Sequence, residues 1–196
     1  DIVGQDHLVG EKGIITKMLE QNKLFSMILY GPAGCGKTSI AEIIANMFPL
    51  STFSFNASCD SKAKLKEIID SAKFYDNIIC IIDEIHRMKK DVQDFLLPFL
   101  ESGTITLIGL TTENPYRAIN PAIRSRCHIY RMNEINKDDV MSLLKRTIIK
   151  EGFNEMGDDI LEYISIASSC EIRTALNMLE IASMLDKDDL NLVNVK

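Results

Sequence analysis

The residues best suited to chemistry lie in segment 31–38, whose sequence GPAGCGKT fits the pattern G-x-x-x-x-G-K-[ST]. Its glycines allow a tight turn in which backbone N–H groups face a phosphate. Lys37 is expected to reach the β- and γ-phosphates of a nucleotide, and the Thr38 hydroxyl to bind Mg²⁺. A strand pattern before the segment and a helical pattern after it disfavour a chance match. The predicted nucleotide-binding residues here are Gly31, Pro32, Ala33, Gly34, Cys35, Gly36, Lys37, Thr38 and Ser39.

A second candidate is the pair Asp83-Glu84, which directly follows the apolar run 77–82. A phosphate-binding loop needs an acid at the end of a neighbouring strand, and Asp83 would hold the water shell of the Mg²⁺ ion. Glu84 would orient and polarise an attacking water, which suits hydrolysis better than simple nucleotide binding. The predicted ligands are therefore ATP and Mg²⁺. Taken alone, the same segment also fits a strand that ends in solvated charges.

Residues 81–87, IIDEIHR, also match the DExH box of a nucleic-acid helicase. Such a helicase needs two RecA-like domains, hence a far longer chain with its own motifs downstream. His86 suggests a metal site, but none of the three histidines is spaced with another as a metal-binding pair. A lone histidine is more often a polar turn residue or a hydrogen-bond donor to a neighbouring group. We therefore favour an ATPase acid pair and expect no metal ligand at His86.

Composition places the chain among ordinary soluble globular proteins. Its 196 residues, 46% of them hydrophobic and 26% charged, suffice for one good core. No apolar run approaches the roughly 20 residues that span a bilayer, and no signal-peptide pattern opens the chain. The five cysteines are scattered and odd in number, which argues against a disulfide framework. These features predict a cytoplasmic protein that does not contact a membrane.

The formal net charge is −6. A protein that binds nucleic acid mainly through its overall field is usually basic. The charge therefore argues mildly against nucleic-acid binding, and any such contact must use a local patch or a part of the protein outside this chain.

Strand and helix patterns alternate up to about residue 131. Five short runs predict strands, and three of them are nearly continuously apolar, as in a buried parallel sheet. Pro98 is expected to end or kink the helix that contains it. The alternation predicts an α/β fold, a three-layer αβα domain with a parallel five-stranded sheet. The strand patterns cover residues 26–30, 51–55, 77–82, 104–111 and 127–130, and the helical patterns 36–47, 61–73 and 89–97.

The remaining sequence contains helical patterns and no strand pattern. Asn136, followed by Asp138 and Asp139, indicates a helix start with acid near the positive end of the dipole. We predict a P-loop αβα domain over residues 1–132 and a small all-α domain over residues 133–196. The tail resembles the start of another element, so we expect the chain to be truncated. The helical patterns cover roughly residues 137–150, 157–168 and 170–185.

Further motifs resemble those of the AAA+ ATPases, specifically the clamp-loader branch. Residues 120–130, NPAIRSRCHIY, are expected to form a short helix that carries a Ser-Arg-Cys box and runs into the last strand. Residues 1–10, DIVGQDHLVG, resemble the Box II segment, and Ser125-Arg126-Cys127 resembles the arginine-finger motif of clamp loaders. Within that branch the chain looks most like the RarA family, also called MgsA, of replication-associated recombination ATPases related to the Werner-helicase-interacting protein. The segments that carry this resemblance are SMILYGPAGCGKT, DEIHR, QDFLLP, ESGTITLIGLTTENP and EIRTALNMLE, of which GLTTENP is the most specific. The resemblance covers nearly the whole chain.

The resemblance implies roles for residues outside the phosphate loop. The backbone around Ile2 and Val3 would frame the adenine, with His7 as a further candidate. Thr112 would be the sensor 1 residue that hydrogen-bonds the attacking water or the γ-phosphate, with Thr111 as the alternative. Without the resemblance, both threonines could equally be ordinary β-branched strand residues.

Two arginines receive roles in the same way. Arg126 would be the finger that reaches the ATP of a neighbouring subunit, and Arg173 would reach the γ-phosphate from the lid as sensor 2. On periodicity alone, they could be a solvated surface arginine and a helix-face ion-pair residue. The family pattern near Arg173 is usually Gly-Asp-x-Arg, whereas this chain reads Cys-Glu-Ile-Arg over residues 170–173.

As a whole, the resemblance implies an enzyme that hydrolyses Mg-ATP to drive remodelling of DNA at stalled replication forks, in recombination and repair. Implied partners are forked, end or junction DNA and the single-stranded-DNA-binding protein or other replication proteins, in the bacterial cytoplasm or nucleoid. The family forms homo-oligomers through C-terminal regions that this chain lacks, so the core alone is expected to be monomeric.

Two competing functions share most of these residues. A clamp-loader subunit or a Holliday-junction branch-migration motor would have the same phosphate loop, acid pair and finger, but the TTENP segment argues against both. A non-hydrolysing scaffold would use nucleotide only to set subunit contacts. The presence of Lys37, Asp83, Glu84 and Arg126 argues against the scaffold.

Overall fold

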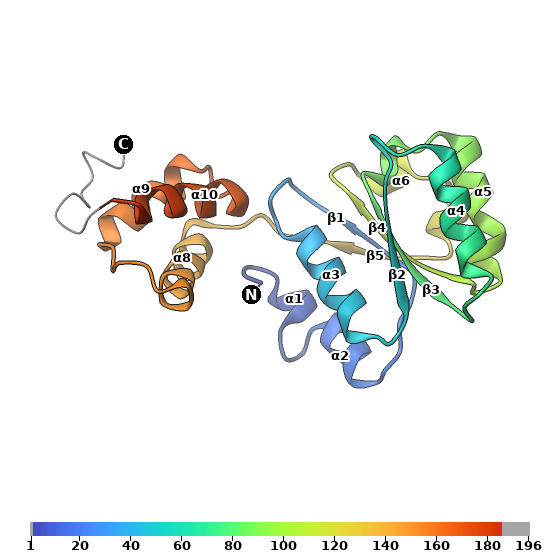
Figure 1. Cartoon of the computed structure of the whole chain (residues 1–196), viewed down its shortest axis with the longest axis horizontal. Helices are drawn as coiled ribbons and strands as arrows, with labels where there is room; N and C mark the ends of the chain where they lie inside the picture. Colours follow the sequence, from blue (N-terminus) through green and yellow to red (C-terminus); the bar gives the residue numbers. More distant parts are fainter. Residues whose placement is uncertain (1, 186–196) are drawn as a thin grey trace. The chain divides into compact units, whose positions relative to one another are not determined.

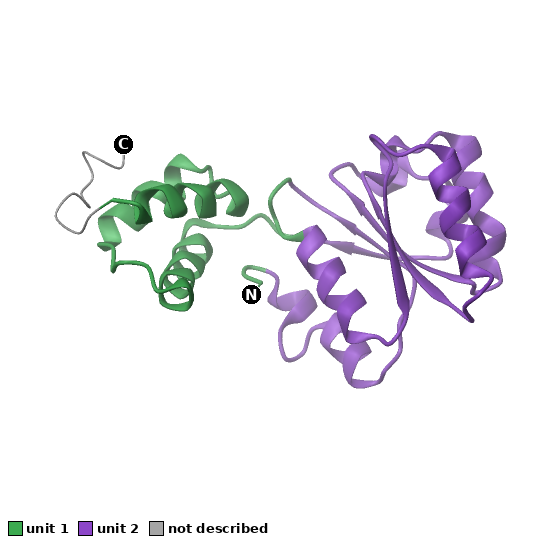
Figure 2. Ribbon diagram, viewed as in Figure 1, with its two compact units in different colours: residues 1–4, 33–36, 133–196 green, residues 5–32, 37–132 purple. Residues whose placement is uncertain are grey.

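The structure is a computed structural model that describes residues 2–185. The chain divides into two compact units (Figure 2). The larger unit comprises residues 5–32 and 37–132, and the smaller one holds the described parts of 1–4, 33–36 and 133–196. The further element expected in the tail 186–196 lies outside the described residues.

A five-stranded parallel sheet forms the centre of the larger unit, as predicted. Its strand order is β2-β3-β4-β1-β5, so the strand that precedes the phosphate loop lies between β4 and β5. The two central strands β3 and β4 are almost entirely buried, which explains their runs of isoleucine and leucine. The strands are β1 (Met27–Tyr30), β2 (Ser51–Asn56), β3 (Ile78–Asp83), β4 (Ile105–Thr111) and β5 (His128–Arg131).

Helices cover both faces of this sheet (Figure 1). Ile78, Cys80 and Ile82 of β3 belong to a core cluster that also includes residues of α4 and α5. The alternate residues of β3 point to the opposite face, because side chains alternate along a strand; α3, which is not part of that cluster, contacts β3 and β4. The crossover helices are α3 (Lys37–Met47), α4 (Lys62–Ala72) and α5 (Lys90–Glu101).

The expectation for Pro98 is wrong in part, because α5 continues through it to Glu101. A proline in a helix removes one backbone donor and leaves the carbonyl four residues earlier without its partner. Here Asp94 and Pro98 both lie on the exposed side of α5. Water can therefore solvate that carbonyl, and the last turn is retained.

Short helices that the sequence patterns did not predict flank the sheet. They are α1 (Asp6–Val9), α2 (Ile14–Glu20), the 3₁₀ turn η1 (Ile85–Arg87) and α6 (Pro115–Ala118). The short helix expected within 120–130 is α7 (Pro121–Arg124). Asn114 and Asn120 cap α6 and α7 with their side chains, and each helix has proline in its first turn. Four-residue helices carry too few apolar positions for periodicity to reveal them.

The described part of residues 133–196 contains three helices and no strand: α8 (Lys137–Glu151), α9 (Asp158–Ala167) and α10 (Ile172–Ser183). The predicted start of α8 is confirmed as a capping box, in which Asn136 and Asp139 satisfy each other's backbone N–H groups. Gly152 ends α8 with a φ of 71°, a conformation that favours glycine. No helix within residues 2–185 has the length and apolar character needed to cross a membrane.

Candidate nucleotide-binding and hydrolysis site

The predicted phosphate loop connects β1 to α3. Gly34 and Gly36 have φ values of 71° and 91°, which L side chains rarely adopt. α3 begins at Lys37, so the loop runs into the positive end of an eleven-residue helix. Thr38 and Ser39 are exposed in the first turn of that helix. The local structure is therefore the one that a phosphate-binding loop requires.

The Lys37 ammonium group bends back over the start of the loop. Its Nζ donates hydrogen bonds to the carbonyl oxygens of Gly31 at 3.0 Å and Pro32 at 2.5 Å. These two bonds hold the charge at the loop between β1 and α3. An ammonium group at this place is available to a phosphate bound by the loop.

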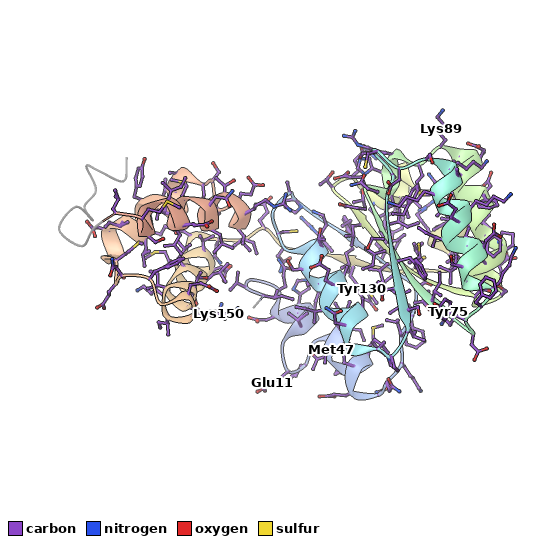
Figure 3. The ribbon with its side chains drawn as sticks, in the orientation of Figure 1. Glu11, Met47, Tyr75, Lys89, Tyr130 and Lys150 are labelled. Carbon is purple, nitrogen blue, oxygen red and sulfur yellow. The ribbon has the colours of Figure 1, made fainter. Side chains whose placement is uncertain are left out.

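The sheet places the other candidate residues at the same edge. Strand β4 lies between β1 and β3, and Tyr30 of β1 pairs with Thr111 of β4. Ile82 of β3 pairs with Gly109, so Asp83 ends its strand at nearly the same level. Ligands of open α/β sheets bind beyond the carboxyl ends of the strands. Figure 3 labels Tyr75, which precedes β3, and Lys89, which follows it.

Asp83 and Glu84 occupy different backbone conformations. Asp83 is the last residue of β3, and its Oδ1 accepts a hydrogen bond from the Glu84 N–H at 2.9 Å. Glu84 has a φ of 52° and a ψ of 40°, in the left-handed region. A non-glycine residue held there carries a strain of about 1–3 kcal/mol, and such strain gathers at functional sites. The chain turns sharply at Glu84, and its side chain leaves the line of the strand.

His86 lies much closer to these groups than its sequence context indicated. Its imidazole is 8% exposed, and its Nε2 lies 3.2 Å from Glu84 Oε2. Its Nδ1 lies 2.9 Å from Thr111 Oγ1. Within residues 2–185 no three His, Cys, Asp or Glu side chains gather as metal ligands. The ring is thus a buried link between the ends of β3 and β4.

The two threonines after β4 have different surroundings. Thr111 is 1% exposed, and its Oγ1 accepts a hydrogen bond from the Glu113 N–H at 3.0 Å. Thr112, the next residue, is exposed. Thr111 is therefore engaged within the protein, while the Thr112 hydroxyl faces outward at the same sheet edge. Thr112 remains our prediction for sensor 1.

We expected a short helix to carry Arg126, but the residue lies in the turn after α7. α7 ends at Arg124, and Ser125 is its C-cap residue. Arg126 donates to the carbonyl of Ala122 at 2.6 Å and forms an ion pair with Glu101 at the end of α5. The expectation that a helix carries the Ser-Arg-Cys box is wrong, because α7 is four residues long and ends before the box.

The smaller unit contains Ile2, Val3 and Arg173, three further residues with predicted roles. A Cβ on Gly34 would clash with the Glu171 side chain, so the loop packs closely against the residue at the N-cap position of α10. Arg173 is exposed in the first turn of that helix. Val3 is buried and Ile2 is half-buried. His7, in the larger unit, contacts the backbone carbonyl of Arg131 through Nε2 at 2.8 Å.

The chain departs from the Gly-Asp-x-Arg pattern at a position where the backbone has positive φ. Ser169 and Cys170 have φ values of 53° and 59°. Cys170 occupies the position of the family's glycine, and the backbone has kept the left-handed conformation that glycine favours. The arginine therefore follows a glycine-like turn although the glycine is missing.

Comparison with known proteins places these features in a family. The profile of the ATPase family associated with various cellular activities (AAA) matches residues 27–134. Replication-associated recombination protein A of Bacillus subtilis (strain 168) is 42% identical over 194 residues, which cover 96% of this chain and 46% of that protein. ATPase WRNIP1 of Dictyostelium discoideum is 36% identical, over 96% of this chain and 23% of that protein.

Solved structures agree on the fold. The Thermotoga maritima RuvB Holliday junction branch migration motor has a TM-score of 0.82 at 22% identity, over 98% of this chain and 67% of that chain. The chain spans less than half the length of the curated relatives named above. The matched profile covers residues 31–38 and the Asp83-Glu84 pair, and the parallel sheet belongs to the same fold as that solved structure. The chain belongs to the AAA family of ATPases.

Proposed function

We propose that this chain is the ATP-hydrolysing module of a motor that remodels DNA at stalled replication forks, in recombination and repair. One observation carries the ATPase part of the proposal. Lys37 follows β1, the Asp83-Glu84 pair follows β3 and Thr112 follows β4, and these three strands are neighbours in a parallel sheet. A phosphate-binding group, an acid pair and a polar sensor thus share one sheet edge.

The donor set fits Mg²⁺ and a nucleotide. Oxygen ligands are those that Mg²⁺ prefers, and Thr38 offers an exposed hydroxyl while Asp83 offers a carboxylate at the strand end. When bound, Mg²⁺ supplies charge neutralisation at the phosphates. Lys37 would exchange its loop carbonyls for phosphate oxygens. The backbone at Ile2 and Val3 would border the adenine.

Glu84 would act on the attacking water. Its side chain is 30% exposed, so solvent can reach it, and its Oε2 lies 3.2 Å from His86 Nε2. General-base catalysis of this kind contributes roughly 10²- to 10⁴-fold in rate. Thr112 would complete the water site from the neighbouring strand.

We propose that residues 133–196 form the lid of the ATPase module and residues 1–132 its αβα domain. Arg173, at the start of α10, would act from the lid as sensor 2. Arg126 would act in trans on the ATP of a neighbouring subunit, which makes a homo-oligomer the active form. An arginine finger of this type contributes roughly 10³- to 10⁵-fold in rate.

The DNA part of the proposal is supported by relatives. Two of them are named for replication-associated recombination and as the ATPase WRNIP1. The net charge of −6 gives it no support. We propose forked, end or junction DNA as the substrate, the single-stranded-DNA-binding protein or other replication proteins as partners, and the bacterial cytoplasm or nucleoid as the location.

ATPase assays on the full-length protein test the proposal. Wild type should hydrolyse ATP, and Glu84→Gln should lose roughly 10²- to 10⁴-fold in kcat while it still binds nucleotide. Glu67→Gln makes the same chemical change at an exposed position of α4 and should leave kcat unchanged. Equal rates for wild type and Glu84→Gln would refute the motor.

The same assay separates the DNA substrates. We expect forked DNA to change the rate of the wild type more than duplex DNA of equal length. A response to four-way junctions alone would favour a branch-migration motor, and a response to primer-template only with a sliding clamp would favour a clamp loader. A basal rate that no DNA changes would leave the ATPase and remove the DNA role.

A further inference from the structure

His86 is a buried ring with a polar partner at each nitrogen. It lies in η1, the turn that directly follows Glu84, and its side chain is 8% exposed. Nε2 lies 3.2 Å from Glu84 Oε2, and Nδ1 lies 2.9 Å from Thr111 Oγ1. The Glu113 carboxylate lies farther from Nε2, at 3.6 Å. The ring therefore joins the proposed catalytic carboxylate to the end of β4.

The neighbouring groups favour one arrangement of hydrogens on the ring. Thr111 Oγ1 accepts from the Glu113 N–H at 3.0 Å, and its hydroxyl hydrogen has two acceptors within reach, the Glu113 carbonyl oxygen at 3.4 Å and His86 Nδ1 at 2.9 Å. The shorter distance favours His86, and with Nδ1 as an acceptor the neutral ring carries its hydrogen on Nε2. That N–H lies on the nitrogen that faces Glu84 Oε2 at 3.2 Å. One tautomer satisfies both ends of the ring.

The link continues to the phosphate loop. The carbonyl oxygen of Thr111 accepts a hydrogen bond from the N–H of Gly31, the first residue of the loop, at 3.2 Å. The backbone and side chain of Thr111 thus connect Gly31 with His86, whose other ring nitrogen lies beside Glu84. Buried hydrogen-bond networks of this kind hold their members in one arrangement.

We propose that His86 is a positioning residue that orients the Glu84 carboxylate for ATP hydrolysis, with Thr111 holding the ring in place. The inference rests on the proposed role of Glu84. A glutamate side chain has three rotatable bonds, so it can adopt several rotamers. The backbone of Glu84 is held in a left-handed turn, but this does not fix the position of its carboxylate. A polar contact with a buried ring, here at 3.2 Å, selects one arrangement, as the third member of an activated pair commonly does.

Two substitutions in the full-length protein separate the two ends of the ring. His86→Gln places an amide N–H near the position of Nε2, whereas His86→Asn reaches only the Thr111 side. We expect His86→Asn to lower kcat by about 10- to 100-fold with little change in KM, because misplaced groups cost rate rather than binding. His86→Gln should recover part of that loss. His128→Asn, at an exposed position of β5, is the matched control and should keep the wild-type kcat.

The Glu84→Gln background distinguishes positioning from a general structural role. If His86 acts through Glu84, adding His86→Asn to Glu84→Gln should lower the remaining single-turnover rate less than twofold. Thr111→Val, which removes the hydroxyl and keeps the shape, should lower kcat in the same direction as His86→Asn, and the two should not be additive.

The possible outcomes are distinct. Equal kcat for wild type and His86→Asn, or equal losses in the wild-type and Glu84→Gln backgrounds, would overturn the inference while the ATPase stands. A His86→Asn protein with raised KM and a lowered melting temperature, not improved by His86→Gln, would also overturn it. No ATP hydrolysis by the wild type would refute the proposed function, and the inference with it.

Discussion

Replacing Glu101 with glutamine should raise ATP hydrolysis by the full-length oligomer, and the size of the gain follows from the ion pair with Arg126. In its proposed role on the ATP of a neighbouring subunit, Arg126 would first have to leave Glu101, with which it forms an ion pair. The side chains of the pair are 35% and 53% exposed, so water and salt screen their attraction. Exposed pairs of this kind contribute about 0.2–1 kcal/mol, which corresponds to about 1.4- to 5-fold in an equilibrium. The expected gain is therefore small.

The assay is steady-state ATP hydrolysis over protein concentration and salt. Glu101→Gln should raise the rate within that range at low salt, and the advantage should shrink as salt screens the wild-type pair. Glu67→Gln serves as the control, because it removes one negative charge from an exposed position of another helix. In an Arg126→Ala background, Glu101→Gln should have no effect.

Two results would refute this reasoning. A rate for Glu101→Gln well below that of the wild type would mean that Glu101 presents Arg126 to its target instead of competing for it. A gain that persists in the Arg126→Ala background would mean that Glu101 acts on something other than the arginine.

Two further predictions concern stability and reactivity. Cys170→Gly should stabilise the fold by about 0.5–1 kcal/mol, or about 1–4 °C in melting temperature. Relief of the left-handed backbone conformation outweighs the greater freedom of glycine in the unfolded chain. Cys59→Gly, at an exposed position with negative φ, should not raise the melting temperature, and equal shifts for the two variants would contradict the explanation. Burial raises the pKa of the Cys80 and Cys127 thiols to about 12, so both stay protonated near pH 8. Peptide mapping after iodoacetamide treatment should therefore find exposed Cys59 modified and these two intact until the protein is denatured, and rapid labelling of either in the native state would refute the pKa argument.

The sheet could be predicted from the sequence because local patterns carry most of its information. Buried parallel strands are short, apolar and rich in β-branched residues, and those of β3 and β4 stand out from the helices around them. The phosphate loop is also local, since eight consecutive residues hold its turn and its lysine. The expectation that Pro98 could end its helix is wrong because exposure, which decides whether a helix tolerates proline, depends on the tertiary fold.

The candidate site could be predicted only in part, for a related reason. Asp83 and Glu84 could be chosen as candidates because they follow an apolar strand pattern. Their neighbours in space, however, depend on which strand lies beside β3. The contact between His86 and Thr111 joins residues 25 positions apart, and so does the pair of Glu101 with Arg126. Nothing in the spacing of either pair distinguishes it from solvated residues.

Residues 83–86 match the DExH box of helicases, and their positions in the structure explain this match without a shared helicase function. Asp83 ends a buried strand, where any P-loop ATPase places an acid for the metal. Glu84 turns the chain through a left-handed conformation, which brings the residue two positions later back toward it. A buried side chain at that position that carries both a donor and an acceptor can hold the Glu84 carboxylate and a neighbouring strand together, and histidine supplies both on one rigid ring. Selection for a held glutamate can thus produce the same letters in an ATPase that is not a helicase.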